Sequence, residues 1–428
     1  MQTSATTRRS LLGALGALAL PGCAIRPETA APPRAAAFRD TLALRPGAPF
    51  QPSLFRSFFL GGFECSTHRR ADGRRLDLIA ATRHNRLAGQ DYRQLAGYGI
   101  RSVRDGLRWH LVESAPGRYD WSSVLPMLRA AEGMGLQVAW DLCHYGWPDD
   151  LDVFSAAFVD RFARFAGAFA RLHLAETGRP PMVCPVNEIS FLAWAGGDKA
   201  WINPMRRGHG RVLKRQLVRA AIAATHAVRA VAPDARILAI DPMIHVVPRK
   251  GQAPRRAAAY TELQFQAWDM LAGRRDPELG GGPEMLDVIG VNYYWNNQWE
   301  DRGAPVTLSD PRHRPMHAML AAVHARYARP IFLAETSIEG EDRAAWLRYI
   351  GQELRTAMRA GVPVEGCCLY PVLSHPGWDD DRYCANGLLE MEPDGAGGRV
   401  VHAPLVAELR RQQELFVPLL SGSPAVQV

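Results

Sequence analysis

Hydrophobic residues follow two alternating patterns along the chain from residue 55 onward. Short runs rich in β-branched and aromatic residues alternate with longer stretches in which apolar residues recur every three or four positions. The clearest helical stretches span residues 154–176, with phenylalanine at 158, 162, 165 and 169, and residues 211–232. The short runs predict eight strands, at residues 55–66, 100–109, 137–146, 182–189, 235–243, 286–295, 330–337 and 364–375.

The order of these elements favours a closed barrel. The strands are apolar without strict alternation, which is typical of parallel strands buried on both faces. A doubly wound open sheet is the competing architecture, but its Gly-rich phosphate loop is missing, because Gly61 and Gly62 lie inside the first strand pattern. No domain boundary interrupts the alternation. We therefore expect an α/β protein with one (β/α)8 TIM-barrel domain over residues 51–420.

The first residues of the chain have the pattern of an export signal. Arg8 and Arg9 precede an apolar stretch at residues 11–20, which is shorter than the ~20 residues of a membrane span and resembles a twin-arginine signal peptide. Residues 20–23 resemble a lipoprotein cleavage box with Cys23 as the lipidated residue; ordinary cleavage without a lipid is the alternative. We expect a signal peptide over residues 1–23, a linker over residues 24–50, and a location that is periplasmic or lipid-anchored to the bacterial envelope.

Composition and charge exclude some classes of protein. With 47% hydrophobic and 22% charged residues, the 428-residue chain can bury a large core and is not intrinsically disordered. The net charge of +8 comes mostly from arginines scattered along the sequence rather than gathered in blocks. This distribution argues against nucleic-acid binding.

The cysteines match no zinc-binding pattern. Cysteines in short apolar runs are usually small buried hydrophobes, so we expect free core thiols at Cys65, Cys143, Cys184, Cys367 and Cys368. The sequence leaves open whether Cys384 pairs with a neighbour.

Polar residues gather at the carboxyl ends of the predicted strands, where such barrels carry their chemistry. Glu188 ends the fourth strand and Glu335 ends the seventh, so the two carboxylates face each other across the barrel mouth. A glycosidic bond needs two carboxylates, one as acid and one as nucleophile, about 5–5.5 Å apart in a retaining enzyme. The alternative for each is a structural ion pair with an arginine at the rim.

Residues near this pair suit the same chemistry. Arg104 on the second strand could keep Glu335 ionised, and Tyr294 could donate a hydrogen bond to it. The amide of Asn187 could bind a sugar hydroxyl, and aromatic residues at the rim offer flat faces for sugar rings. Asp141 and His144 end the third strand.

The motifs around these residues resemble glycoside hydrolase family 1, the β-glucosidase and β-galactosidase family. Residues 185–189 resemble the acid/base motif, residues 333–336 the nucleophile motif, and residues 290–294 the motif of the sixth strand. The resemblance covers residues 55–390 and implies Glu188 as acid/base and Glu335 as nucleophile. It also implies that the substrate is bound by Asn187, Arg104, His144, Asn292, Tyr294 and Trp378.

Three departures from the family change the expected sugar. Residues 66–69 replace the first-strand Gln, Tyr370 replaces the eighth-strand Trp, and Gly377 replaces the Glu before the final Trp. The loss of these ligands, with His68 and Arg69 gained, argues against plain glucose or galactose. Glu64 is expected to pair with an arginine.

The sequence thus predicts an exported retaining β-glycosidase that acts on an oligosaccharide or glycoside and needs no metal or organic cofactor. A transglycosidase of envelope glycan assembly would need the same carboxylates and is one alternative. A carbohydrate-binding lipoprotein without catalysis is another, although two retained glutamates argue against it.

Overall fold

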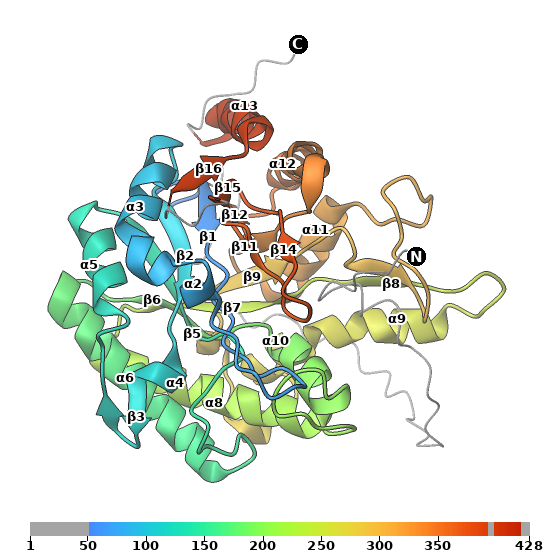
Figure 1. Cartoon of the computed structure of the whole chain (residues 1–428). Coiled ribbons are helices and arrows are strands. Elements are labelled where there is room, and N and C mark those ends of the chain that lie inside the picture. Colours follow the sequence, from blue (N-terminus) through green and yellow to red (C-terminus); the bar gives the residue numbers. More distant parts are fainter. Residues whose placement is uncertain (1–50, 393–397, 421–428) are drawn as a thin grey trace.

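The computed structural model describes residues 51–392 and 398–420. Eight parallel strands close into a barrel in the order β1-β12-β11-β9-β7-β6-β5-β2, with helices around the outside (Figure 1). This architecture confirms the predicted (β/α)8 barrel, and each strand falls inside a predicted run. The predicted signal peptide at residues 1–23, with Cys23, and the linker at residues 24–50 lie outside the described residues.

Each barrel strand is followed along the chain by one helix of the outer ring. The strands are β1 (Phe59–Gly62), β2 (Ser102–Gly106), β5 (Gln137–Cys143), β6 (Met182–Val186), β7 (Arg236–Pro242), β9 (Val288–Asn292), β11 (Ile331–Thr336) and β12 (Val364–Leu369). The helices that follow them are α3 (His84–Gly97), α5 (Leu125–Gly133), α6 (Ala156–Thr177), α8 (Gly210–Val231), α10 (Gln266–Leu271), α11 (Met316–Tyr327), α12 (Arg343–Arg359) and α13 (Ala403–Leu420).

The apolar core has two layers because the strands are buried on both faces. The inner layer fills the barrel with side chains such as Leu238, Ile240 and Phe332. The larger outer layer lies between the strands and the helical ring. Two-sided burial explains why the strand runs are apolar without alternation.

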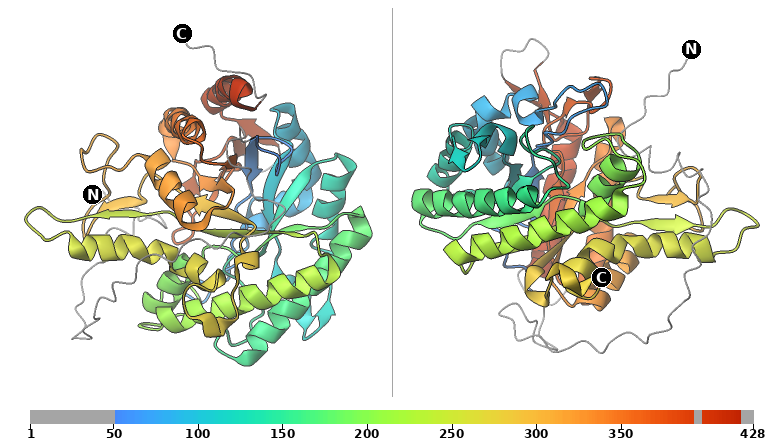
Figure 2. Two further views of the ribbon diagram at one scale, coloured as in Figure 1. Left: turned by 180° about the vertical axis from the view of Figure 1, so that it is seen from behind. Right: turned by 90° about the horizontal axis from the view of Figure 1, so that it is seen from below.

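Helix α6 shows how the predicted periodicity becomes packing. Its phenylalanines at 158, 162, 165 and 169 are all fully buried, and the ring of Trp109 stacks on Phe165 with centroids 5.3 Å apart. The helix ends where Gly178 adopts a left-handed conformation, at φ 67°, which glycine adopts without strain. Figure 2 shows α6 and α8 running side by side along one flank of the barrel.

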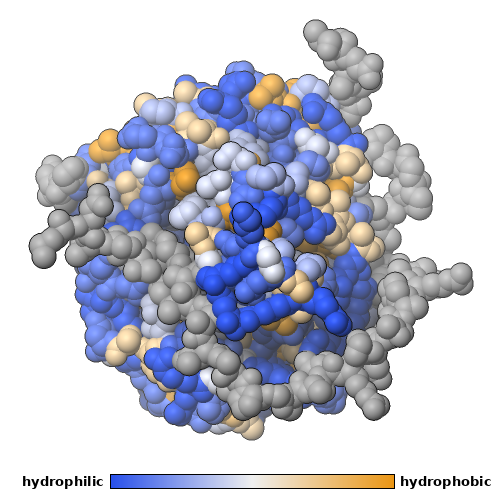
Figure 3. All heavy atoms as spheres, turned by 90° about the vertical axis from the view of Figure 1, so that its right-hand side faces the viewer, coloured by the Kyte–Doolittle hydropathy of each residue, from blue (hydrophilic) through white to orange (hydrophobic). Residues whose placement is uncertain are grey.

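Shorter elements decorate the barrel. Strands β8 (His245–Val247) and β10 (Gln298–Glu300) pair with each other, and helix α9 (Arg255–Glu262) lies beside them in a projection at the right of Figure 1. Hydrophilic residues dominate the visible face on that side (Figure 3). Three two-stranded sheets are formed by β3 (Glu113–Ala115) with β4 (Arg118–Tyr119), β13 (His375–Pro376) with β14 (Tyr383–Cys384), and β15 (Leu389–Met391) with β16 (Arg399–Val401).

Short helical segments complete the loops. They are α2 (Leu78–Ala81), α4 (Trp109–Val112), α7 (Ile189–Leu192), a π-helical turn η1 (Ala193–Asp198), and the 3-10 turns η2 (Leu263–Phe265), η3 (Pro277–Leu279), η4 (Pro283–Met285) and η5 (Gly340–Asp342). None of the described helices has the length and apolar character of a membrane-spanning segment.

The six cysteines of the described residues are buried and free, which confirms the core-thiol prediction for five of them and leaves Cys384 unpaired with another cysteine. Burial raises the pKa of Cys143 to about 12, as expected of inert core thiols.

Candidate active site

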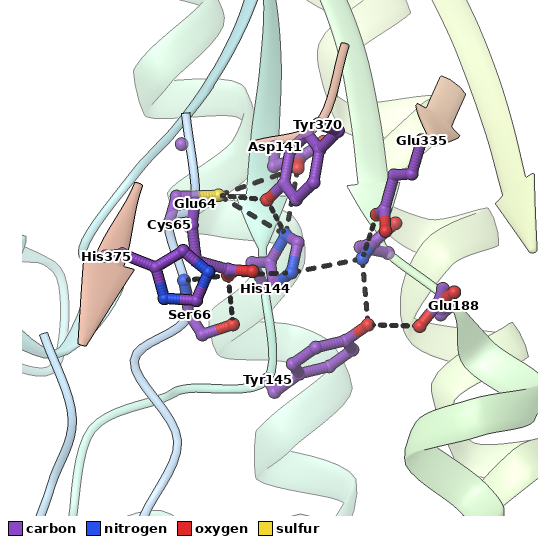
Figure 4. Close-up of polar contacts among 12 residues, drawn as sticks. Glu64, Cys65, Ser66, Asp141, His144, Tyr145, Glu188, Glu335, Tyr370 and His375 are labelled. Atoms are coloured by element: carbon purple, nitrogen blue, oxygen red, sulfur yellow. Dashed lines mark hydrogen bonds and ion pairs between the residues drawn. The ribbon is translucent and has the colours of Figure 1, made fainter. Parts of the chain in front are cut away.

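Glu188 and Glu335 reach the same end of the barrel, from the end of β6 and from β11, and both are fully buried. Hydrogen bonds in series join their carboxylates. Tyr145 Oη donates to Glu188 Oε2 at 2.6 Å, and Asn187 Nδ2 donates to Tyr145 Oη at 2.9 Å (Figure 4). The same amide donates to Glu335 Oε1 at 3.2 Å. A chain of three hydrogen bonds, through Tyr145 and Asn187, therefore connects the two carboxylates.

Three hydrogen-bond donors surround the carboxylate of Glu335. Arg104 Nη1 donates to Glu335 Oε1 at 3.0 Å, and Tyr294 Oη donates to Glu335 Oε2 at 2.9 Å. With the Asn187 amide, one cation and two neutral donors thus contact this carboxylate. Hydrogen bonds and a positive charge both stabilise a carboxylate anion, which is the form that a nucleophile needs.

Arg104 is held by a second carboxylate. Its Nε and Nη2 atoms donate to the two oxygens of Asp141 at 3.1 and 2.8 Å, and the arginine is fully buried. Burial alone would lower the pKa of Arg104, but Asp141 and Glu335 raise it well above its usual value. Burial would likewise raise the pKa of Asp141, but Arg104 and His144 hold it below its usual value. The pair is therefore ionised, with Arg104 aimed at Glu335.

Glu188 has different surroundings, because two neutral groups donate to it. Besides Tyr145, Asn292 Nδ2 donates to Glu188 Oε1 at 2.9 Å. The backbone is strained at both ends of the Tyr145 contact, since Tyr145 has φ 71° and Glu188 has φ 47°, in the left-handed region. Such strain in non-glycine residues is common at functional sites, where the surrounding structure fixes it.

His144 and Asn187 complete a continuous network beneath the carboxylates. His144 Nδ1 lies 3.0 Å from Asp141 Oδ2, and its Nε2 lies 3.2 Å from Asn187 Nδ2. Since the ionised Asp141 oxygen can only accept, the imidazole donates to it from Nδ1. Asn187 Oδ1 in turn accepts from Arg104 Nη2 at 2.7 Å.

Cys65, Asp141 and His144 place three metal-ligand atom types within 4.8 Å of one another. Arg104, however, already donates to both oxygens of Asp141. A cation at this point would lie beside the guanidinium group, so these residues fit a hydrogen-bonded cluster better than a metal centre.

Trp378, the predicted stacking residue, lies outside this network but borders the same mouth. It lines a cavity of about 100 Å³ together with Tyr294 and Glu64. Its ring packs against His68, with ring centroids 4.3 Å apart, and against Tyr145, with centroids 5.6 Å apart.

The residues that depart from the family pattern separate in space. His68 is buried beside Trp378, whereas Arg69 turns away and pairs with Asp149. Tyr370 lies with its hydroxyl near His144 and beneath the Arg104 guanidinium, 4.9 Å from the ring centroid. Glu64 accepts hydrogen bonds from the amide and hydroxyl of Ser66 and lies 3.6 Å from His144 Nε2; its pairing with an arginine stays a prediction.

Sequence reasoning missed the part played by Tyr145, although this residue directly follows His144. Its hydroxyl links Asn187 to Glu188, and its ring packs against Trp378. A tyrosine next to a predicted sugar-binding histidine was the available signal. Nothing in the pattern shows which way a side chain turns after a strand end.

Comparison with known proteins finds solved structures with a similar fold. Neither a protein-family model nor a curated protein sequence matches the chain. Solved structures do match it, among them β-glycosidase BGL167, with 18% identity and a TM-score of 0.63 over 81% of this chain and 89% of that one. The family 1 β-glucosidase from Thermotoga maritima matches with 14% identity and a TM-score of 0.65 over 86% of this chain and 99% of that one.

The β-glycosidase from Thermosphaera aggregans is similar to the same extent, with 13% identity and a TM-score of 0.67 over 87% of this chain and 99% of that one. At these identities the likeness establishes a shared fold along nearly the whole of each solved chain.

Proposed function

We propose that the chain is a retaining β-glycosidase that hydrolyses O-glycosidic bonds of an oligosaccharide or glycoside. The observation that carries the proposal is a pair of buried carboxylates with unlike surroundings at the mouth of the barrel. Arg104 contacts Glu335, whereas the neutral Tyr145 and Asn292 contact Glu188. A nucleophile must stay ionised and a general acid must hold a proton, so this difference fits the two roles. The fold shared with β-glucosidases supports the same class of reaction.

The reaction would proceed in two displacements. The Glu335 carboxylate attacks the anomeric carbon as the bond to the leaving oxygen breaks, and Glu188 gives its proton to that oxygen. The product is a covalent ester between the sugar and Glu335. Glu188, now ionised, takes a proton from water, and the resulting hydroxide equivalent attacks the same carbon and releases the sugar and the Glu335 carboxylate.

The remaining predicted residues would orient these groups and the sugar. Asn187 donates to Glu335 and Asn292 donates to Glu188, and both amides can exchange these contacts for sugar hydroxyls. Tyr294 fixes the nucleophile, His144 supports Asn187, and Trp378 offers an apolar face beside the cavity. Tyr145 Oη donates a hydrogen bond to one oxygen of Glu188. This hydrogen bond must break if the same oxygen is to contact the glycosidic oxygen of the substrate.

Hydrolysis of aryl β-glycosides tests the nucleophile. We expect Glu335→Ala to lose about 10⁴-fold or more in kcat relative to wild type. The control is Glu414→Gln, a change at an exposed position of α13. A 2-fluoro glycoside should trap an adduct on Glu335 that peptide mass spectrometry identifies. Equal rates for wild type and Glu335→Ala, or an adduct on another residue, would remove the proposed nucleophile.

Leaving-group dependence tests the acid. We expect Glu188→Gln to lose about 10²–10⁴-fold in the first displacement on an alkyl glycoside, and far less on a dinitrophenyl glycoside, whose leaving group needs no proton. A uniform loss on both would contradict the role of Glu188 as acid. Retention is checked by NMR, which should detect the β-anomer as the first sugar released; an α-anomer would indicate inversion.

Export belongs to the proposal as well. The twin-arginine pattern at Arg8 and Arg9 supports translocation, and Cys23 supports a lipid anchor. Cell fractionation should find the wild-type protein with membranes and Cys23→Ala in the soluble periplasm. Soluble wild-type protein would point to cleavage without lipid.

A further inference from the structure

A cavity of about 100 Å³ opens at the barrel mouth next to the nucleophile. It lies between the loops that follow β9, β11 and β12. Tyr294 belongs to both places, because its side chain lines the cavity and its hydroxyl donates to Glu335 Oε2 at 2.9 Å. Trp295, which is 42% exposed, lines the cavity where it meets solvent. A molecule that enters here therefore contacts Tyr294, which is hydrogen-bonded to Glu335.

Asn296 lines this cavity with polar atoms that the fold does not use. The residue is 2% exposed, and neither its Oδ1 nor its Nδ2 has a hydrogen-bond partner among the described residues. A buried amide without partners is costly, so its presence in a folded protein needs an explanation. A ligand that both donates and accepts hydrogen bonds would supply the missing partners.

The next residue shows what a structural asparagine looks like in the same loop. Asn297 Nδ2 donates to the carbonyls of Met243 and Asn292, and its Oδ1 accepts from the Tyr294 amide. Both asparagines are buried. The side chain of Asn297 forms hydrogen bonds within the protein, whereas Asn296 lines the cavity.

Glu64 lines the same cavity and places a carboxylate in it. Its side chain is held by Ser66, whose amide nitrogen donates to Glu64 Oε1 at 3.0 Å. His144 Nε2 lies 3.6 Å from the same oxygen, so Glu64 borders the network beneath the nucleophile (Figure 4). A fixed carboxylate beside an amide accepts hydrogen bonds from neighbouring hydroxyls, as a sugar ring presents them.

The charges around the cavity are mostly negative. Its lining includes the carboxyl groups of Glu64, Glu339, Asp379 and Asp380. Arg382, also in the lining, is bound by Glu339 through two hydrogen bonds of 2.6 and 2.8 Å. The guanidinium group is thus neutralised, and a carboxylate on the ligand would meet an excess of like charge.

We propose that this cavity binds the outer hydroxyls of the terminal sugar, that Glu64 and Asn296 determine its specificity, and that the site accepts glycosides of uncharged sugars and rejects those of uronic acids. The inference deepens the proposed glycosidase function and rests on it. Like charges about 5 Å apart at an effective dielectric constant of about 20 correspond to a discrimination of roughly 200-fold.

Charge selection is tested with pairs of aryl β-glycosides that share the aglycone. The uncharged hexoside that wild type hydrolyses fastest in a panel is compared with its uronide. We expect kcat/KM to favour the hexoside at least 100-fold, and Glu64→Gln to shrink this ratio about tenfold or more. The control Glu414→Gln should leave it unchanged. Equal hydrolysis of both by wild type, or an unchanged ratio in Glu64→Gln, would overturn the proposal.

The asparagine pair separates binding from folding. Asn296→Ala should lower kcat/KM for the hexoside roughly tenfold while the Tm stays the same or rises, because no protein hydrogen bond is lost. Asn297→Ala should lower the Tm, because three protein hydrogen bonds are lost. Full kcat/KM in Asn296→Ala would refute a sugar contact at this residue.

Direct binding distinguishes the failure of this inference from the failure of the proposed function. A β-glucosidase of the same fold has been solved with glucoimidazole, so this compound is a suitable probe. If wild type hydrolyses no glycoside but binds glucoimidazole more weakly after Asn296→Ala, the cavity inference stands and the enzymatic function fails. If hydrolysis depends on Glu335, but Glu64→Gln leaves the hexoside preference unchanged and Asn296→Ala leaves glucoimidazole binding unchanged, only the cavity inference fails.

Discussion

Two neighbouring residues of strand β2 belong to two different clusters of ionisable side chains, one at the candidate active site and one that only holds parts of the fold together. Arg104 points into the barrel, where it contacts Glu335 and Asp141. Asp105 points outward, where its Oδ2 accepts from Tyr92 Oη at 2.5 Å and lies 2.8 Å from His84 Nε2. Both side chains are fully buried. Adjacent residues on a strand face opposite sides, so one strand feeds two separate ionic clusters.

The outer cluster joins parts of the chain that are far apart in sequence. His84 at the start of α3 lies between Asp105 and Asp91, with its Nδ1 2.7 Å from Asp91 Oδ2. Arg399 of β16 donates to both oxygens of Asp91 at 2.7 and 2.9 Å, across 308 positions of sequence. Strand β2, helix α3 and strand β16 are thereby fixed to one another.

The comparison teaches that burial and charge alone do not identify an active site. Both clusters hold an arginine and carboxylates in good geometry. In the inner cluster, however, the arginine contacts a carboxylate next to a cavity, whereas in the outer cluster every resolved partner belongs to the scaffold. Position relative to the mouth of the barrel decides which cluster can meet a substrate.

The largest expected difference between the clusters is in catalysis. Arg104→Met removes the cation beside Glu335 and a donor to Asn187, so we expect kcat/KM on the best aryl glycoside to fall by about 10³-fold or more. Arg399→Met removes an equally buried arginine from Asp91 and should leave kcat/KM of the folded enzyme unchanged. Steady-state kinetics on protein shown to be folded by circular dichroism provide the measurement.

Both substitutions should destabilise the fold, because each takes a buried cation away from a carboxylate that contacts it. The expected loss in the free energy of unfolding is about 3–5 kcal/mol, measured by urea denaturation. If Arg399→Met reduced kcat/KM as much as Arg104→Met, the separation into site and scaffold would be wrong.

The outer cluster also has a pH signature. Burial alone would lower the pKa of His84, but Asp105 and Asp91 raise it to about 9, from an unfolded value of about 6.5. The protonated imidazole therefore stabilises the fold fully below about pH 6.5, and this contribution is lost as the pH rises through 9. The pKa difference corresponds to roughly 3 kcal/mol.

His84→Gln tests this dependence. The difference in the free energy of unfolding between wild type and His84→Gln should be largest at pH 6 and shrink by roughly 3 kcal/mol at pH 9.5. His226→Gln, at an exposed position of α8, should show no such change. A difference between wild type and His84→Gln that stays constant from pH 6 to 9.5 would mean that His84 is neutral in the folded protein.

The sequence predicted the barrel because its signal is local. Each strand is a short apolar run and each outer helix has a continuous apolar face, so eight units could be recognised without knowing their partners. The projection formed by β8, α9 and β10 was not foreseen. Its strands are three residues long and pair only with each other, which leaves no periodic pattern.

The sequence also placed the polar residues of the mouth, since strand ends are recognisable. The sequence did not show which strand residues face the inside of the barrel and which face the helices. Arg104 was therefore identified as a candidate site residue, whereas the ionic cluster around Asp105 was not predicted. The identical neighbours Asn296 and Asn297 make the same point. Their roles differ because of contacts with distant segments, and such contacts cannot be obtained from one sequence without the fold.

The smallest effect is expected where the same ion-pair geometry lies at the surface. Arg129 of α5 donates to both oxygens of Glu176 at 2.8 and 2.9 Å, which closely matches the bonds between Arg399 and Asp91. The side chain of Arg129 is 62% exposed, whereas that of Arg399 is 1% exposed. Water and salt screen the exposed pair, so Arg129→Met should leave the urea midpoint within experimental error, while Arg399→Met lowers it clearly. A comparable loss from both variants would show that bond geometry, rather than burial, sets the strength of these pairs.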